Sequence, residues 1–219
     1  MNLPPQTLLQ SRYEIRRPVE QDAVGARYLG LDLRLGRDVS VRTFPLPPPQ
    51  AHGDHKAMDD RISQVASLRH PGVELFLDMG FHQRLAFVIS EWVPQGHLGL
   101  RLQQGTLDWP SAAFVIRSLL RTLRDLHAEG VAHGRLSPSA VLLGPGGQFR
   151  LRNLSLGPTD LLPEAAPTRA PEGPEPTPAA DLYACGQLLR AMVGPGAPPE
   201  AEALVAGLTA PEPEDRLSF

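Results

Sequence analysis

The chain has 219 residues, of which 42% are hydrophobic and 21% are charged, so it can bury a normal core as one large domain or two lobes. Its net charge of -3 gives no reason to expect a nucleic-acid or membrane-surface partner, and no apolar run is long enough to span a membrane. Residues 1–12 lack the basic and apolar regions of a signal peptide, and the single cysteine, Cys185, excludes an internal disulfide, so a reducing, cytoplasmic location is expected.

Lysine is nearly absent from the sequence. Lys56 is the one lysine among 21 basic residues, so any mechanism that needs a lysine side chain has a single candidate. The high content of arginine, alanine, proline and glycine suggests a GC-rich bacterial genome as the source.

The first part of the chain has the pattern of a small antiparallel sheet. Residues 1–11 are predicted to be a loose, flexible arm. Residues 12–44 show short alternating strands with turn residues between them, and residues 72–93 continue this pattern with two further strands. Between them, residues 54–69 place apolar side chains at helical spacing. This part is therefore predicted to combine one sheet with one helix.

The remainder of the chain has mainly helical patterns. A short helix is expected near residues 97–103. Asp108 can cap a long amphipathic helix that ends at Gly130, and residues 177–178 can cap another. Residues 199–208 form a further helical segment.

The loop at residues 131–143, VAHGRLSPSAVLL, lies between the long helix and a strand-turn-strand pattern. It resembles the catalytic loop of the eukaryotic-like Ser/Thr protein kinases of bacteria, in which the pattern is H-[RG]-D-L-x-P-x-N-[IV]-L-[LI]. Further short matches to this family follow one another in the correct order: R-Y-E-I at 12–15, L-R-H-P at 68–71, A-P-E at 170–172, D-L-Y-x-x-G at 181–186 and E-D-R at 214–216.

This resemblance spans roughly residues 12–219 and implies an α+β, bilobal, protein-kinase-like fold. Residues 12–93 would form the N-lobe, a small antiparallel sheet with one αC helix. Residues 94–219 would form a mainly helical C-lobe in which the αG helix is reduced or absent.

The resemblance also shows that the positions that carry chemistry in the family hold other residues here. These substitutions are Arg42 for the phosphate-binding lysine, Arg61 for the αC glutamate, Arg135 for the catalytic aspartate, Ala140 for the metal-binding asparagine and Asn153 for the magnesium-binding aspartate. Phosphoryl transfer depends almost wholly on positioning and charge stabilisation by such groups. We therefore expect no intact catalytic residue and no metal, with Asn153 as a weak candidate ligand.

The phosphate-binding loop is altered in the same way. Its three glycine positions fall at Glu20, Asp22 and Gly25, so two carboxylates lie where phosphates would bind. Arg27 replaces the valine that lies over adenine in the family. The resemblance leaves a vestigial nucleotide pocket as a candidate, made of Gly25, Ser40, Arg42, Glu91, Val93 and Leu142.

Positions with a structural role in the family are retained. The resemblance implies that Val65, Phe76, His133 and Leu154 form a column on the carboxylate of Asp181, and that Glu172 pairs with Arg216. His127 and His133 are metal or base candidates by residue type, but no cluster of ligands accompanies them in the sequence.

Three functional hypotheses remain open. The first is a pseudokinase, a non-enzymatic module without a cofactor that binds a protein partner such as an active kinase or its substrate. The second is a divergent Ser/Thr kinase or nucleotide-binding enzyme that uses ATP with or without Mg²⁺, supported by Arg42 and Asn153. The third is a fragment whose function lies elsewhere, because the sequence stops at Phe219 where the family would continue.

Overall fold

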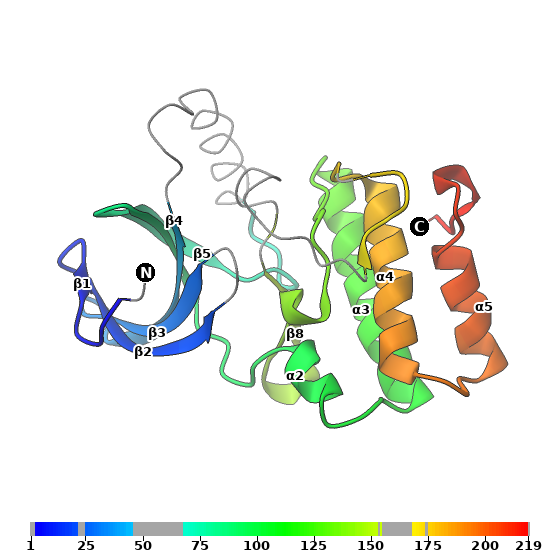
Figure 1. The fold of residues 1–219 in the computed structure, drawn as a ribbon, viewed down its shortest axis with the longest axis horizontal. Helices are drawn as coiled ribbons and strands as arrows, with labels where there is room; N and C mark the ends of the chain where they lie inside the picture. The colour runs from blue at the N-terminus through cyan, green and yellow to red at the C-terminus, as the bar shows by residue number, and fades with distance from the viewer. Residues whose placement is uncertain are drawn as a thin grey trace. The chain divides into compact units, whose positions relative to one another are not determined.

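The computed structural model describes residues 3–21, 25–45, 68–152, 154, 168–173 and 175–218, and has a mixed α+β architecture with an antiparallel sheet (Figure 1). These residues divide into two compact units. The first unit holds the described residues up to 69 together with 74–93, and the second holds 70–73 and the described residues from 94 onward. The first unit is consistent with a kinase-like N-lobe.

The first unit is a six-stranded antiparallel sheet with the strand order β1-β2-β3-β4-β6-β5. Its strands are β1 (Leu8–Leu9), β2 (Tyr13–Gln21), β3 (Ala26–Asp32), β4 (Arg37–Pro45), β5 (Phe76–His82) and β6 (Leu85–Glu91). Because successive side chains of a strand point to opposite faces, Val39 and Val41 enter the buried apolar cluster while Ser40 and Arg42 lie on the other face.

Residues 3–11 differ from the loose arm that the sequence predicts. Strand β1 pairs with β2, and Leu9 is fully buried in the same apolar cluster as Leu3. The Leu3 backbone N–H also donates to the hydroxyl of Tyr28 at 2.9 Å. Two apolar side chains and a hydrogen bond therefore fix this segment to the sheet.

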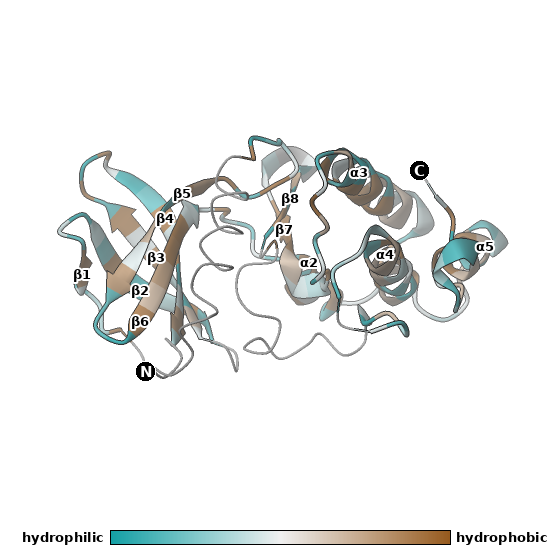
Figure 2. Ribbon diagram, turned by 90° about the horizontal axis from the view of Figure 1, so that it is seen from above, coloured by the Kyte–Doolittle hydropathy of each residue, from teal (hydrophilic) through white to brown (hydrophobic). Residues whose placement is uncertain are grey.

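The second unit contains the helices α2 (Leu98–Leu102), α3 (Trp109–Ala128), α4 (Pro178–Val193) and α5 (Pro199–Leu208), with the hairpin β7 (Val141–Leu143) and β8 (Phe149–Leu151). The side chain of Asp108 accepts from Ser111 N–H at the start of α3, and Thr177 accepts from Ala180 N–H at the start of α4. Hydrophobic residues run along α3 and α4 (Figure 2), and α4 packs against both α3 and α5.

Residues 70–73, which the sequence analysis assigned to the N-lobe, lie with the second unit. Gly72 is so close to Thr122 of α3 that a Cβ atom would collide with its side chain, and the Leu151 N–H donates to the Gly72 carbonyl at 2.7 Å. The predicted αC helix lies outside the described residues, except for its last residues. The described residues 194–198 connect α4 to α5 without a helix. No helix of the described ranges is both long and apolar enough to cross a membrane.

Candidate functional site

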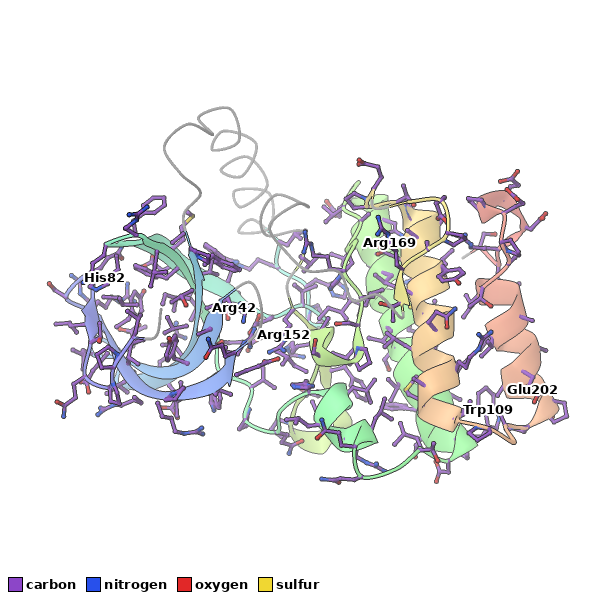
Figure 3. All side chains as sticks on the ribbon, viewed as in Figure 1. Arg42, His82, Trp109, Arg152, Arg169 and Glu202 are labelled. Atoms are coloured by element: carbon purple, nitrogen blue, oxygen red, sulfur yellow. The ribbon has the colours of Figure 1, made fainter. Side chains whose placement is uncertain are left out.

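Two arginines of the first unit share the face of the sheet opposite the apolar cluster. Arg27 of β3 and Arg42 of β4 are directly opposite in the antiparallel register, so their side chains leave the sheet on the same face. Only 5% of Arg27 and 8% of Arg42 is exposed. The Arg42 side chain is labelled in Figure 3. Its guanidinium lies 5.4 Å from the centre of the Phe44 ring. The face where the resemblance places adenine and phosphates thus carries two buried cations.

A buried ion pair crosses this face. Arg27 Nη1 donates to Glu74 Oε1 at 3.3 Å, and the side chains are 6% and 9% exposed. Glu74 lies beside the start of β5, because the neighbouring Leu75 carbonyl accepts from Glu91 N–H at 2.9 Å. Strands β4 and β6 separate β3 from β5, and each adds about 4.8 Å, so the pair must extend over both.

The same face of the sheet carries a rung of small polar side chains. Ser40 of β4 is directly opposite Ser90 of β6, and Ser90 is in turn opposite Phe76 at the start of β5. Ser40 is 1% exposed, and within the described residues neither its Oγ nor Arg27 Nε has a hydrogen-bond partner. This strip is therefore polar, buried and incompletely hydrogen-bonded.

Sequence analysis did not identify Glu74 as part of this face. The feature that could have pointed to Glu74 is that it is the single carboxylate within the otherwise apolar residues 73–77, two positions before Phe76. Phe76 itself is half-buried in β5.

The other candidates of the nucleotide pocket in this unit have local structural roles. A Cβ atom at Gly25 would collide with the Thr43 carbonyl oxygen, so the close approach of β4 alone requires glycine there. The Glu91 carboxylate accepts from Leu75 N–H at 3.0 Å, and Val93 is half-buried.

In the second unit, Asp181 of α4 holds the loop that resembles the catalytic loop. Its carboxylate accepts from the backbone N–H groups of His133 and Gly134, both at 2.7 Å, and lies 2.8 Å from His127 Nε2. The Asp181 side chain is 1% exposed. Gly134 has a positive φ of 71°, and a Cβ atom there would collide with Pro176, so this position favours glycine.

His133 is a buried structural residue. Its Nδ1 accepts from Arg135 N–H at 3.2 Å, so the Nε2 atom carries the proton and donates to the Arg152 carbonyl at 3.1 Å. Burial lowers the pKa of His133, which keeps the ring neutral. Both ring nitrogens therefore form hydrogen bonds to backbone groups. The described ranges also contain no group of three or more potential metal ligands among His, Cys, Asp and Glu.

The structure places the remaining candidates of the second unit as follows. Ala140 is fully buried, and its carbonyl accepts from Arg152 N–H at 2.9 Å. Arg135 is half-buried, whereas Leu142 on β7 and Leu154 are buried. Arg61, Val65 and Asn153 lie outside the described residues.

Arg216 is a second buried residue, after Asp181, that connects separate segments of this unit. Its Nη1 and Nη2 donate to the two carboxylate oxygens of Glu172 at 2.6 and 2.7 Å, and its side chain is fully buried. It also donates to the carbonyls of Ala179, Ala210 and Pro211. The guanidinium holds the pKa of the Glu172 carboxyl below its usual value. The structure thus brings together the two ends of the segment from 172 to 216.

No protein-family model matches the chain, but curated relatives match it at low identity. CBL-interacting protein kinase 16 of Oryza sativa subsp. japonica is 25% identical over 201 residues, which cover 83% of this chain and 43% of that kinase. Serine/threonine-protein kinase PknA of Mycobacterium tuberculosis is 26% identical over 196 residues, or 81% of this chain and 46% of PknA. Probable serine/threonine-protein kinase pknA2 of Bifidobacterium longum is 25% identical over 200 residues, which cover 83% of this chain and 26% of that kinase.

These distant relatives are Ser/Thr protein kinases. Their similarity supports a protein-kinase family for this chain and agrees with the α+β architecture of the structure. The chain spans less than half of the length of each of these three relatives.

Proposed function

We propose that this protein is a catalytically impaired, kinase-like module that acts by binding a protein partner. The observation that carries the proposal is the buried ion pair of Arg27 and Glu74 on the sheet face. By the resemblance, adenine would lie against the face that carries Ser40 and beneath the residue at position 27. The protein's own charged side chains lie along that face, so a neutral aromatic base would have to displace a buried ion pair.

The second unit supports the same proposal. The metal-binding asparagine of the family is replaced by the buried methyl group of Ala140, and the catalytic aspartate by Arg135. The interactions that keep the loop in place remain, because Asp181 accepts from two of its backbone N–H groups. A shape that is maintained without the groups that do chemistry suits recognition by another protein.

The proposal is tested by thermal unfolding with millimolar adenosine, ADP and ATP, each with Mg²⁺ and with EDTA. A ligand at 100 times its Kd adds about 2.7 kcal/mol of stability, which raises the Tm by several degrees for a domain of this size. We expect no shift for the natural protein. We expect the double variant Arg27→Val/Glu74→Val to gain a shift with adenosine, which has no phosphate and so reports on the base alone.

The matched control is Glu14→Val/Arg16→Val, because this Arg–Glu pair lies on β2 of the same unit, with the Arg16 side chain 46% exposed and Nη1 3.0 Å from Glu14. It should not gain nucleotide binding. A Mg²⁺-dependent shift of the natural protein with ATP, together with transfer of radiolabelled phosphate to a protein substrate, would instead support the divergent kinase. The buried Arg42 is the residue that favours this second candidate, since a guanidinium can still bind a phosphate.

A further inference from the structure

An aromatic pair lies on the surface of the second unit. Phe114 of α3 is 46% exposed, whereas the adjacent Val115 and Ile116 are buried. The centre of its ring is 5.9 Å from that of Phe149 on β8, and the ring planes are tilted by 53°. Phe149 is half-buried and directly opposite Leu143 of β7 in the hairpin register. The helix and the hairpin thus form one apolar surface.

Two arginines continue this surface along α3. The Arg117 guanidinium is 6.0 Å from the centre of the Phe114 ring, and Arg121 follows one turn later on the same side of the helix. Both side chains are exposed, and neither forms an ion pair with any carboxylate in the described part of the chain. One turn after Arg121 the helix carries Asp125, whose carboxylate is hydrogen-bonded to Arg124 and His70.

We propose that Phe114, Phe149, Arg117 and Arg121 form a docking surface for an acidic protein segment that contains an apolar anchor residue. Aromatic residues and arginine are the side chains most enriched where protein interfaces bind tightly. Although the chain has a net charge of -3, the two arginines beside the exposed aromatic ring make a local positive site, because neither pairs with a carboxylate of the described residues. The charge selects an acidic partner, and the ring selects an apolar side chain within it.

The spacing along α3 limits the partner's sequence. At about 1.5 Å per residue, Arg117 and Arg121 lie roughly 4.5 and 10.5 Å along the axis from Phe114. An extended segment rises about 3.3 Å per residue, so its acidic side chains should lie about one to three positions from the apolar anchor, before or after it according to the direction in which the segment binds. This inference rests on the proposed function only in assuming a protein partner.

Fluorescence anisotropy with a fluorescein-labelled synthetic peptide tests the surface. The probe has a central Leu-Phe pair between runs of glutamate, and two comparison peptides replace either the Leu-Phe pair by Ser-Ser or the glutamates by lysines. We expect saturable binding of the probe to the natural protein, weakened by added salt. Phe114→Ser and Arg117→Glu/Arg121→Glu should each reduce the affinity about tenfold or more.

Arg190→Glu is the matched control, because Arg190 is an exposed arginine on α4 outside this surface. It should leave the affinity within about twofold, since it changes only distant charge. Urea unfolding checks that each variant is folded. Failure of the probe to bind, or equal affinity for Arg117→Glu/Arg121→Glu and Arg190→Glu, would overturn the proposal. Neither outcome depends on nucleotide, so the thermal-shift test of the proposed function stands separately.

Discussion

Asp181 and Arg216 of the second unit are buried ionisable groups that connect loops to helices, whereas Arg27 and Glu74 of the first unit lie across the face of a sheet. Asp181 and Arg216 each make several hydrogen bonds to backbone groups, and each contacts one side chain, His127 and Glu172 respectively. In the first unit, Arg27 has one carboxylate partner in Glu74, its Nε atom has none among the described residues, and the neighbouring Ser40 hydroxyl is also without one there.

We infer from this difference that Asp181 and Arg216 maintain the fold, whereas Arg27 and Glu74 change the chemical character of the sheet face. A buried carboxylate that accepts from two backbone N–H groups cannot be replaced without leaving those groups unsatisfied. An ion pair that lies on a sheet contributes little net stability, because the cost of desolvation offsets the attraction between its members. Removing one member should therefore destabilise either region, whereas removing both Arg27 and Glu74 should cost little or nothing.

Asp181→Asn should have the largest effect. An amide retains one acceptor oxygen but loses the charge that faces His127 and the backbone of His133 and Gly134, so the free energy of unfolding should fall by roughly 3–5 kcal/mol. Urea unfolding measures this change. Glu202→Gln is the control, since this carboxylate is exposed on α5 (Figure 3) and its loss should change stability by at most about 0.5 kcal/mol. Equal effects would contradict an anchoring role for Asp181.

The Arg27–Glu74 pair should respond differently to one substitution and to two. Arg27→Val alone leaves the Glu74 carboxylate buried without its partner and should cost roughly 3 kcal/mol. Arg27→Val/Glu74→Val removes both charges and should be neutral or stabilise the fold by about 1–4 kcal/mol. Urea unfolding of the two single variants and the double variant gives the coupling energy. A double variant less stable than either single variant would show that the pair is part of the anchoring structure.

The sequence predicted the elements whose signals are local, and it missed contacts between distant residues that neither a local pattern nor the family resemblance connects. Asp108 and Thr177 lie at the starts of their helices because each can accept from a backbone N–H three residues later. Strand β1 was not foreseen, because Leu8–Leu9 is too short to show alternation. The ion pair was also missed, because 47 residues separate Arg27 from Glu74 and no local pattern connects them.

The pair of Glu172 and Arg216 should make stability depend on acid pH. The pKa of the Glu172 carboxyl is lowered in the folded protein, so its contribution is fully present above the usual pKa, about 4.3, and is lost as the pH falls through the folded value. Glu172→Gln should cost roughly 2 kcal/mol at neutral pH and make stability less sensitive to pH below about 5. Urea unfolding from pH 7 to 3 checks both. An unchanged slope would mean that other carboxyls, such as Asp32 with its similarly lowered pKa, dominate acid unfolding.

Ser40→Ala should have the smallest effect on the free energy of unfolding, and it should not be destabilising. Removing a buried hydroxyl that has no partner in the described structure relieves a desolvation cost, so stability should stay equal or rise by up to about 1 kcal/mol. Thr43→Val is the control on the same strand, because the Thr43 hydroxyl donates to the Ala26 carbonyl at 3.2 Å and its removal should cost about 1 kcal/mol. If Ser40→Ala raises the free energy of unfolding and Thr43→Val lowers it, the Ser40 hydroxyl is a buried polar group without a stabilising hydrogen bond. A clear loss in Ser40→Ala would instead mean that the hydroxyl binds water or an ion there, and the contrast between the two units would then disappear.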